Sequence, residues 1–208
     1  MPKQPMLVGQ VVLIVVDLQK GGAEGAAAGI PVMEGHAEVL ANAQRVVAAA
    51  RHRGIPIVFF QEAHRRCLVD FGRELDGTEG VHCLEGDAST ELVEQLRPSG
   101  PNEHFIAKRR YSCFFGTDLQ ILLRGLRADT LVLIGALTDV CVHYTFADGH
   151  QHDFYMRVVR DAVIGSSRTA HDASLAAFDY LQSGACRNTD ELVQDWAPAM
   201  REISAQVV

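Results

Sequence analysis

The sequence has no apolar segment that is long enough to cross a membrane. The longest uninterrupted apolar stretches are Val11–Val16 and Leu131–Leu137 with its glycine, whereas a membrane-spanning helix needs about 20 such residues. The N-terminal Met-Pro-Lys-Gln-Pro also lacks the basic start and the apolar stretch of a signal peptide. We therefore expect a cytoplasmic protein with no membrane partner.

Positive charge is scarce as well. Lys and Arg number 19 against 26 Asp and Glu, which gives a net charge of −7. A general nucleic-acid surface needs clustered cations to face the phosphates, so this balance argues against a nucleic-acid partner. The five cysteines are an odd number in a chain without an export signal, which favours reduced thiols over a disulfide framework.

The common signatures of nucleotide, metal and serine chemistry are absent. The glycines after the first apolar run, Gly21, Gly22, Gly25 and Gly29, do not make G-x-G-x-x-G. No P-loop, H-E-x-x-H, paired C-x-x-C or G-x-S-x-G occurs either. Any chemistry must therefore come from residues outside these motifs.

Short β-branched runs alternate with longer helical patterns along the chain. The predicted strands are 11–16, 57–60, 104–108, 131–135, 155–160 and 185–188, and the predicted helices are 36–53, 91–96, 117–126, 140–150 and 169–182. Such alternation predicts an α/β fold in three layers, doubly wound, with a mainly parallel six-stranded sheet. No Pro/Gly/Ser-rich linker divides the 208 residues, so we expect one domain over 1–208.

Three residues with useful chemistry follow predicted strands. Asp17 and Lys108 end the first and third strands, and Cys141 follows the fourth at the start of a helix. Ligands of parallel sheets bind at the carboxyl ends of the strands. There, a helix N-terminus and the Lys108 cation would lower the pKa of the Cys141 thiol, and Asp17 could accept its proton. Backbone N–H groups of the turn 135–141 could stabilise an oxyanion.

Each of these residues also has a purely structural interpretation. Asp17 could cap the turn that follows its strand. Lys108 opens a basic run that could be a solvated surface, and Cys141 could be a small buried hydrophobic residue. Spacing alone leaves these alternatives open.

Four segments of the chain resemble the isochorismatase-like cysteine hydrolases, the group that includes nicotinamidase, N-carbamoylsarcosine amidase, ureidoacrylate amidohydrolase and biuret hydrolase. They read 13-LIVVDLQ-19, 108-KRRYSCFFGTDL-119, 131-LVLIGALTDVCVHYTFADGH-150 and 158-VVRDAV-163. The stretch around Cys141 is the most specific of them, and the order along the chain is the expected one.

The resemblance implies roles for the three residues. Asp17 matches the general acid and base of the family, Lys108 its catalytic lysine and Cys141 its nucleophile. It also implies a cis peptide at Ala136–Leu137 and an oxyanion site on the backbone N–H groups of Leu137 and Cys141. Because members that act on isochorismate lack the cysteine, the resemblance implies hydrolysis of an amide, ureide or carbamoyl C–N bond through a thioester.

A metal site is the main point of departure from the nicotinamidases. Their ligand positions correspond here to Glu62, His64 and Asp70, a set that could hold a divalent ion. We favour no metal and no cofactor, with Glu62 and His64 as polar residues of the pocket. The alternative is a nicotinamidase-like, metal-containing amidase.

The long irregular stretch 61–86 is expected either to be functional, for example as a lid or pocket wall, or to be disordered. Substrate contacts are expected from a set of polar and aromatic residues: Gln19, Glu62, His64, Arg65, Tyr111, Phe114 and Phe115. An arginine such as Arg65 could hold a substrate carboxylate, or it could be paired with the acids of its own loop. The resemblance implies a homodimer or homotetramer. A non-catalytic relative that binds a metabolite or a protein is the alternative from another class.

Overall fold

The computed structural model describes residues 5–25 and 29–196. They build a six-stranded sheet in the order β3-β2-β1-β4-β5-β6, and every neighbouring pair is parallel. The strands are β1 (Val11–Val16), β2 (Ile57–Glu62), β3 (Glu103–Lys108), β4 (Thr130–Ala136), β5 (Tyr155–Ile164) and β6 (Cys186–Arg187). The doubly wound parallel sheet predicted from the sequence is confirmed.

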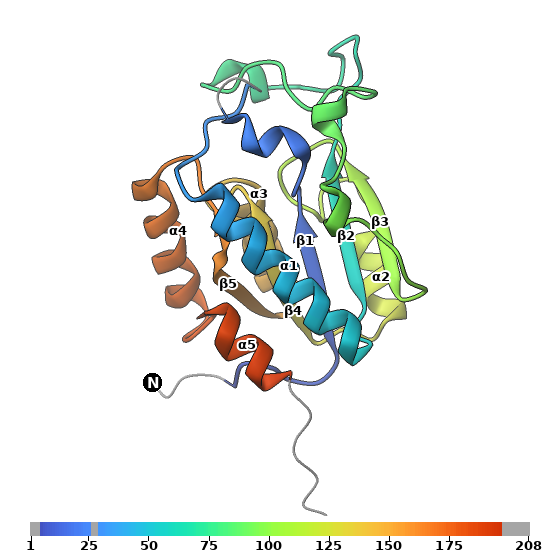
Figure 1. Cartoon of the computed structure of the whole chain (residues 1–208), viewed down its shortest axis with the longest axis vertical. Coiled ribbons are helices and arrows are strands. Elements are labelled where there is room, and N and C mark those ends of the chain that lie inside the picture. The colour runs from blue at the N-terminus through green and yellow to red at the C-terminus, as the bar shows by residue number, and fades with distance from the viewer. Residues whose placement is uncertain (1–4, 26–28, 197–208) are drawn as a thin grey trace, which may run out of the picture.

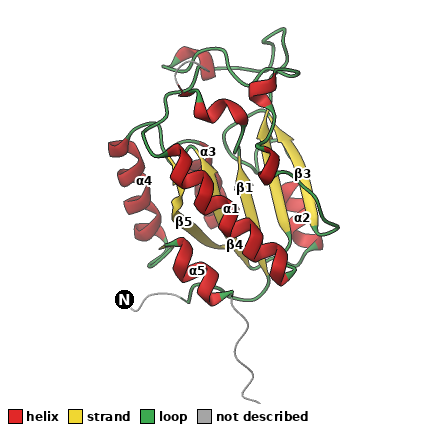
Figure 2. Ribbon diagram, in the orientation of Figure 1, coloured by secondary structure: helices red, strands yellow, loops and turns green. Residues whose placement is uncertain are grey.

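Helices cover both faces of the sheet, which gives three layers (Figure 1). The helices α1 (His36–Arg53) and α5 (Thr189–Asp195) pack on one face. The helices α2 (Leu119–Gly125), α3 (Cys141–Gln151) and α4 (Arg168–Leu181) pack on the other. Figure 2 shows the strands between the two helical layers, with loops gathered beyond one end of the sheet.

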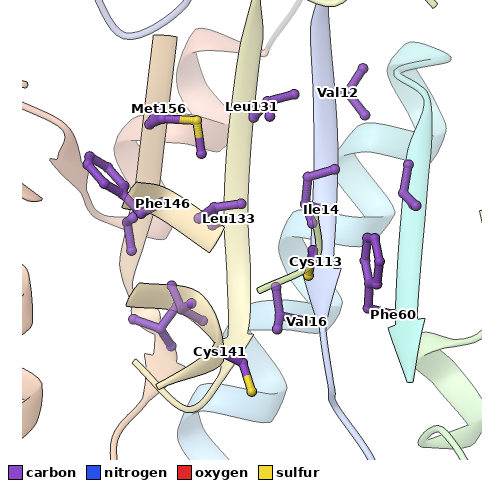
Figure 3. Packing of buried hydrophobic residues seen from close by; sticks show 14 of the residues in the cluster. Val12, Ile14, Val16, Phe60, Cys113, Leu131, Leu133, Cys141, Phe146 and Met156 are labelled. Atoms are coloured by element: carbon purple, nitrogen blue, oxygen red, sulfur yellow. The ribbon is translucent and has the colours of Figure 1, made fainter. Parts of the chain in front are cut away.

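The central strands are apolar without alternation because both of their faces are buried. In β1, Leu13 and Val15 pack toward α1 and α5, whereas Val12, Ile14 and Val16 pack toward α3 and its neighbours. Figure 3 shows this second cluster, with Cys141 at the end of the strands where the arrowhead of β1 lies. The continuous apolar runs in the sequence are thus the signature of a buried parallel sheet.

Helix ends follow the local signals in the sequence. α1 ends at Gly54, whose φ of 66° is left-handed and whose N–H bonds to the carbonyls of Ala50 and Arg51. α4 begins after Ser167, whose hydroxyl accepts a hydrogen bond from the N–H of Ala170. None of the helices within the described residues is long and apolar enough to cross a membrane.

Several predicted elements need correction. Residues 91–96 do not form an α-helix, because only Glu94–Leu96 make a 3-10 turn, η5. A further 3-10 turn, η4 (Ala88–Thr90), precedes this segment. The helix predicted over 117–126 starts only at Leu119, and the Thr117 hydroxyl before it donates to the Cys113 carbonyl and accepts from Leu119 N. α5 was not predicted.

β5 continues to Ile164, four residues past its predicted end. A register irregularity between Leu133 and Gly135 of β4 lets the two strands resume pairing at Gly135–Val163 and Ala136–Ile164. The predicted domain boundaries at 1 and 208 and the segment Met-Pro-Lys-Gln lie outside the described residues.

Candidate active site

The carboxyl ends of β1, β2 and β3 bring charged side chains to the start of α3. The Lys108 ammonium lies 2.7 Å from Asp17 Oδ2 and 3.3 Å from Cys141 Sγ. It also lies 2.8 Å from Glu62 Oε2. Lys108 is fully buried. The three residues that the sequence singled out therefore share one site, and Lys108 is not part of a solvated surface.

Gly135 allows β1 and β4 to approach closely beside this site. Its φ is 123°, and a Cβ built on it would lie 1.9 Å from the Val16 carbonyl oxygen. The chain then turns at Asp17, which has a positive φ of 49° and whose N–H donates to the Phe60 carbonyl. Only glycine fits at position 135, so this residue fixes the backbone that carries the Asp17 carboxylate.

Glu62 is more central than the sequence indicated. Its carboxylate accepts hydrogen bonds from Lys108, from His64 Nε2 at 3.1 Å and from His82 Nε2 at 3.2 Å, and it lies 3.5 Å from Cys141 Sγ. The Gln19 side chain holds the Glu62 backbone, because its oxygen accepts from Glu62 N and its nitrogen donates to Glu62 O, both at 3.0 Å. Glu62 is therefore a fourth charged member of the site.

The two carboxylates have opposite pKa shifts. Burial is the main cause that raises the pKa of Asp17 to about 6, although Lys108 opposes it. Burial acts in the same direction on Glu62, yet Lys108 and the hydrogen bonds of His64 and His82 outweigh it and lower that pKa well below its usual range. Glu62 is consequently the fixed anion, and Asp17 is the carboxyl that exchanges a proton near neutral pH.

The predicted lowering of the Cys141 pKa is wrong for this structure. Burial raises the pKa of the thiol well above its usual value, and the nearby Glu62 and Asp17 carboxylates add to the effect, while Lys108 only opposes it. One oxygen of each carboxylate and the sulfur lie within 4.8 Å of one another. Cys141 is therefore a neutral thiol at rest, with a candidate base beside it.

The turn before α3 has the backbone form that the resemblance implied. The Ala136–Leu137 peptide is cis. The Leu137 carbonyl accepts from the N–H groups of Val140 and Val142 at 3.1 and 3.0 Å. These bonds tie the turn to the first residues of α3. The oxyanion role of the Leu137 and Cys141 N–H groups stays a prediction.

A pocket opens beside Cys141. Its described lining comprises Asp17, Gln19, Glu62, Cys141 and Tyr111 from the expected set, together with Gly21, Gly22, Ile30, Val32, Glu79, His82, Cys83, Ser89, Ala136, Leu137 and Val140. The loop 61–86 supplies part of this wall, as predicted.

Four expected pocket residues lie elsewhere. His64 is fully buried behind Glu62, where its ring stacks on Phe71 at 3.9 Å between centroids. The Arg65 side chain is 55% exposed and pairs with Asp70 at 3.1 Å. Phe114 packs against Phe154 and His152, and Phe115 is 65% exposed. Phe114 and Phe115 thus serve the core and the surface, whereas Tyr111 of the same segment lines the pocket.

Glu79 and His82 are pocket residues that the sequence analysis did not identify. Both come from the irregular loop, and the Tyr111 hydroxyl donates to Glu79 Oε2 at 3.4 Å. A His-Cys pair at 82–83 was visible in the sequence. Its proximity to Glu62, twenty positions away, depends on a loop path that periodicity does not encode.

Four buried residues form a group with the composition of a metal site. Glu62, His64, Glu74 and His82 each offer one ligand atom, and these atoms lie within 4.8 Å of one another. The predicted third ligand, Asp70, is replaced by Glu74, because Asp70 bonds to Arg65 and lies 3.8 Å from His64 Nδ1.

The donor set fits a divalent cation. Two carboxylates and two imidazoles suit such an ion, and His82 Nδ1 faces the Gly80 carbonyl at 2.7 Å, as the outer nitrogen of a metal-bound histidine often does. The same contacts are also satisfied by protonated histidines without a metal ion, because both ring nitrogens of His82 then donate hydrogen bonds to oxygen atoms. Hydrogen bonds to carboxylates raise the pKa values of both histidines against the effect of burial, that of His64 to about 9.

The other four cysteines do not have a lysine and two carboxylates beside them at a helix start. Cys67 is exposed, Cys83 is half-buried, and Cys113 and Cys186 are buried, all as free thiols. Burial raises the pKa of Cys83, Cys113 and Cys186. Among the described thiols, only Cys141 is at a helix start with a lysine and two carboxylates beside it.

A comparison with family models identifies the family of this chain. The sequence model of the isochorismatase domain matches residues 11–190. The chain belongs to the isochorismatase family. This confirms the family predicted from the four sequence segments.

Relatives within the family carry several names. A ureidoacrylate amidohydrolase of Pantoea ananatis is 34% identical over an alignment of 173 residues, and the alignment covers 74% of this chain and 68% of that protein. An Arabidopsis thaliana protein named "probable inactive nicotinamidase" is 30% identical over 168 residues, 78% of this chain and 85% of that protein.

Solved structures share the fold. The N-carbamoylsarcosine amidase of Thermoplasma acidophilum is 26% identical, with a TM-score of 0.70 over 88% of this chain and 98% of that one. The nicotinamidase of Bacillus subtilis is 25% identical, with a TM-score of 0.76 over 86% of this chain and 100% of that one.

Proposed function

We propose that this isochorismatase family member is a cysteine-dependent amidohydrolase that cleaves a C–N bond of a small amide, ureide or carbamoyl compound. The hydrolase class rests on the relatives named as amidohydrolases. The cysteine mechanism rests on one observation: a carboxyl with a pKa of about 6, Asp17, shares the Lys108 ammonium with the Cys141 thiol.

The first half-reaction forms a thioester. Asp17 accepts the proton of Cys141 as the sulfur attacks the carbonyl carbon of the substrate. The tetrahedral oxyanion is stabilised by the backbone N–H groups of Leu137 and Cys141. When the C–N bond breaks, Asp17 returns its proton to the leaving nitrogen, which departs as ammonia or an amine.

Water completes the cycle. Asp17 again accepts a proton, now from the water molecule that attacks the thioester carbonyl. The C–S bond breaks, the carboxylic or carbamic product leaves, and the proton returns to the sulfur. A pKa near the working pH suits a group that must both accept and donate.

Lys108 and Glu62 hold the charges in place. The ammonium stays protonated because the surrounding carboxylates raise its pKa well above the usual value against the effect of burial. It stabilises the thiolate as the Cys141 proton moves to Asp17. Glu62 is positioned by Gln19 and the two histidines, and it orients Lys108 between the sulfur and Asp17.

We propose that these steps need no metal and no cofactor. If a divalent ion binds, Glu62, His64, Glu74 and His82 would hold it, and it would supply positive charge next to Glu62. A nicotinamidase-like, metal-containing amidase is the alternative within enzymes, and the donor set of these four residues is the observation that supports it.

The alternative from another class is a non-catalytic binding relative. Its support is the Arabidopsis relative whose name calls it inactive. Against it, Asp17, Lys108 and Cys141 are all present and within contact distance in this chain. Cytoplasmic location and assembly as a homodimer or homotetramer remain predictions.

Ammonia release from nicotinamide, ureides, biuret-like compounds and carbamoyl amino acids tests the proposal. We expect turnover of one class by the wild type and a loss of at least about 10³-fold in kcat for Cys141→Ala. Cys67→Ala, at an exposed thiol, is the matched control and should keep wild-type turnover. Full activity of Cys141→Ala would exclude the thioester route, and a fully inert wild type would favour the binding alternative.

A further inference from the structure

The pocket beside Cys141 has an acidic wall. Three of its lining residues, Asp17, Glu62 and Glu79, carry carboxyl groups, and none of its described lining residues is an arginine or a lysine. A substrate carboxylate would therefore meet like charges close to the reacting atoms. Such a juxtaposition weakens binding strongly in a poorly solvated site.

The cationic side chains next to this wall already pair with groups of the protein. Lys108 is fully buried and contacts Asp17, Glu62 and Cys141. His82 lines the pocket, but its Nε2 faces Glu62 and its Nδ1 faces the Gly80 carbonyl. Neither group has a nitrogen left to bind a substrate carboxylate.

The arginines near the loop bond to partners outside the pocket. Arg65 pairs with Asp70 at 3.1 Å and Arg66 with Asp87 at 2.6 Å, and both side chains are more than half exposed. Arg109 pairs with Glu85 at 2.5 Å. The sequence-based expectation that Arg65 could hold a substrate carboxylate is therefore not met in this structure.

Glu79 is the carboxyl of the wall that the reaction does not use. It is half-buried, and the Tyr111 hydroxyl donates to it at 3.4 Å. Apolar residues such as Ile30, Val32 and Val140 also line the cavity. Glu79 is thus an acceptor on the cavity wall, where an N–H group or an amine can pair with it.

We propose that the site takes small amides and ureides that carry no acidic group and whose other end is neutral or positively charged, and that Glu79 is the specificity-determining residue. This inference rests on the proposed hydrolase function. It separates the chain from relatives named for ureidoacrylate, a compound that carries a carboxylate.

Two series of length-matched compounds test the inference. The amide series is succinamate, pentanamide and 4-aminobutanamide, and the ureide series is 3-ureidopropionate, butylurea and 3-aminopropylurea. We expect kcat/KM for the neutral and cationic members to exceed that for the acid by at least about tenfold. Calorimetric binding of the same six compounds should show the same order, and it measures charge selectivity without turnover.

Glu79→Gln supplies the second arm. The variant should raise kcat/KM for the acids and lower it for the cationic compounds, while Glu94→Gln, at an exposed acid outside the pocket, should change neither. Acids that bind or react as well as their neutral partners would overturn the inference and leave the proposed hydrolase intact. Absence of turnover with all six, together with the expected binding order, would count against the proposed function and support the inference.

Discussion

Lys108 and Glu62 form a buried ion pair, with 2.8 Å between Nζ and Oε2, at the carboxyl ends of two adjacent strands. The same ammonium contacts Asp17 at 2.7 Å, so one cation compensates two carboxylates from β1 and β2. Removing one member of such a group leaves uncompensated buried charge, which costs far more than the group contributes as a whole.

Lys108→Met is therefore expected to lower both stability and activity. We expect the free energy of unfolding to fall by about 3–5 kcal/mol and kcat by at least about 10²-fold, measured by urea denaturation and ammonia release. The matched control is Lys20→Met, which removes an exposed pair with Glu91 and should leave the free energy of unfolding nearly unchanged. Equal stability losses for the two variants would contradict the central role of Lys108.

The pH dependence of turnover should follow Asp17. Its pKa is raised from 3.8 to about 6, so the ionised form that accepts the thiol proton accumulates as the pH rises through 6. We expect kcat/KM to rise over that interval and to level off above it. A rising limb centred near 4 would show that Asp17 is not the base.

The same shift has a consequence for stability. Because the folded protein disfavours ionised Asp17, this group costs stability above pH 6, and the cost is relieved as the pH falls from about 6 toward 4. Asp17→Asn should remove both the activity and this contribution. Asp172→Asn, at an exposed helical position, should alter neither.

Local sequence signals predicted the sheet and its helices. The apolar runs indicated the buried strands β1 and β4, and Gly54 marked the end of α1. The rule that ligands bind at the carboxyl ends of strands also brought Asp17, Lys108 and Cys141 together. The role of Glu62 was underestimated because its partners, His64, His82 and Lys108, meet it through an irregular loop and a neighbouring strand.

The thiol shows why local rules fail at such a site. A helix start and a lysine predict a lowered pKa for Cys141, but the thiol is buried and two carboxylates, Glu62 and Asp17, lie near it. Burial and like charges then dominate. Likewise, Arg65 bonds to Asp70 five positions away rather than facing the pocket. This pairing depends on the path of the loop, which the sequence pattern does not encode.

Metal removal separates the two interpretations of the Glu62, His64, Glu74 and His82 group. We expect protein dialysed against EDTA to keep its turnover and its melting temperature. Without a metal ion, the protonated His64 and His82 can donate hydrogen bonds to the Glu62 and Glu74 carboxylates. Elemental analysis before and after dialysis verifies the metal content. Loss of activity with EDTA and recovery with zinc or manganese would instead establish the metal-containing amidase.

Gly135→Ala tests the close approach that positions Asp17. The residue has a φ of 123°, and an added Cβ would lie 1.9 Å from the Val16 carbonyl oxygen. Since backbone strain and overpacking add up, we expect a loss of about 3 kcal/mol or more in the free energy of unfolding, with activity falling in the fraction that stays folded. Gly125→Ala, in α2 with no atom within 4 Å of the new Cβ, is the matched control and should keep stability at or above wild type. If the two variants unfold at the same urea concentration, the contact between β4 and Val16 does not hold the site in place.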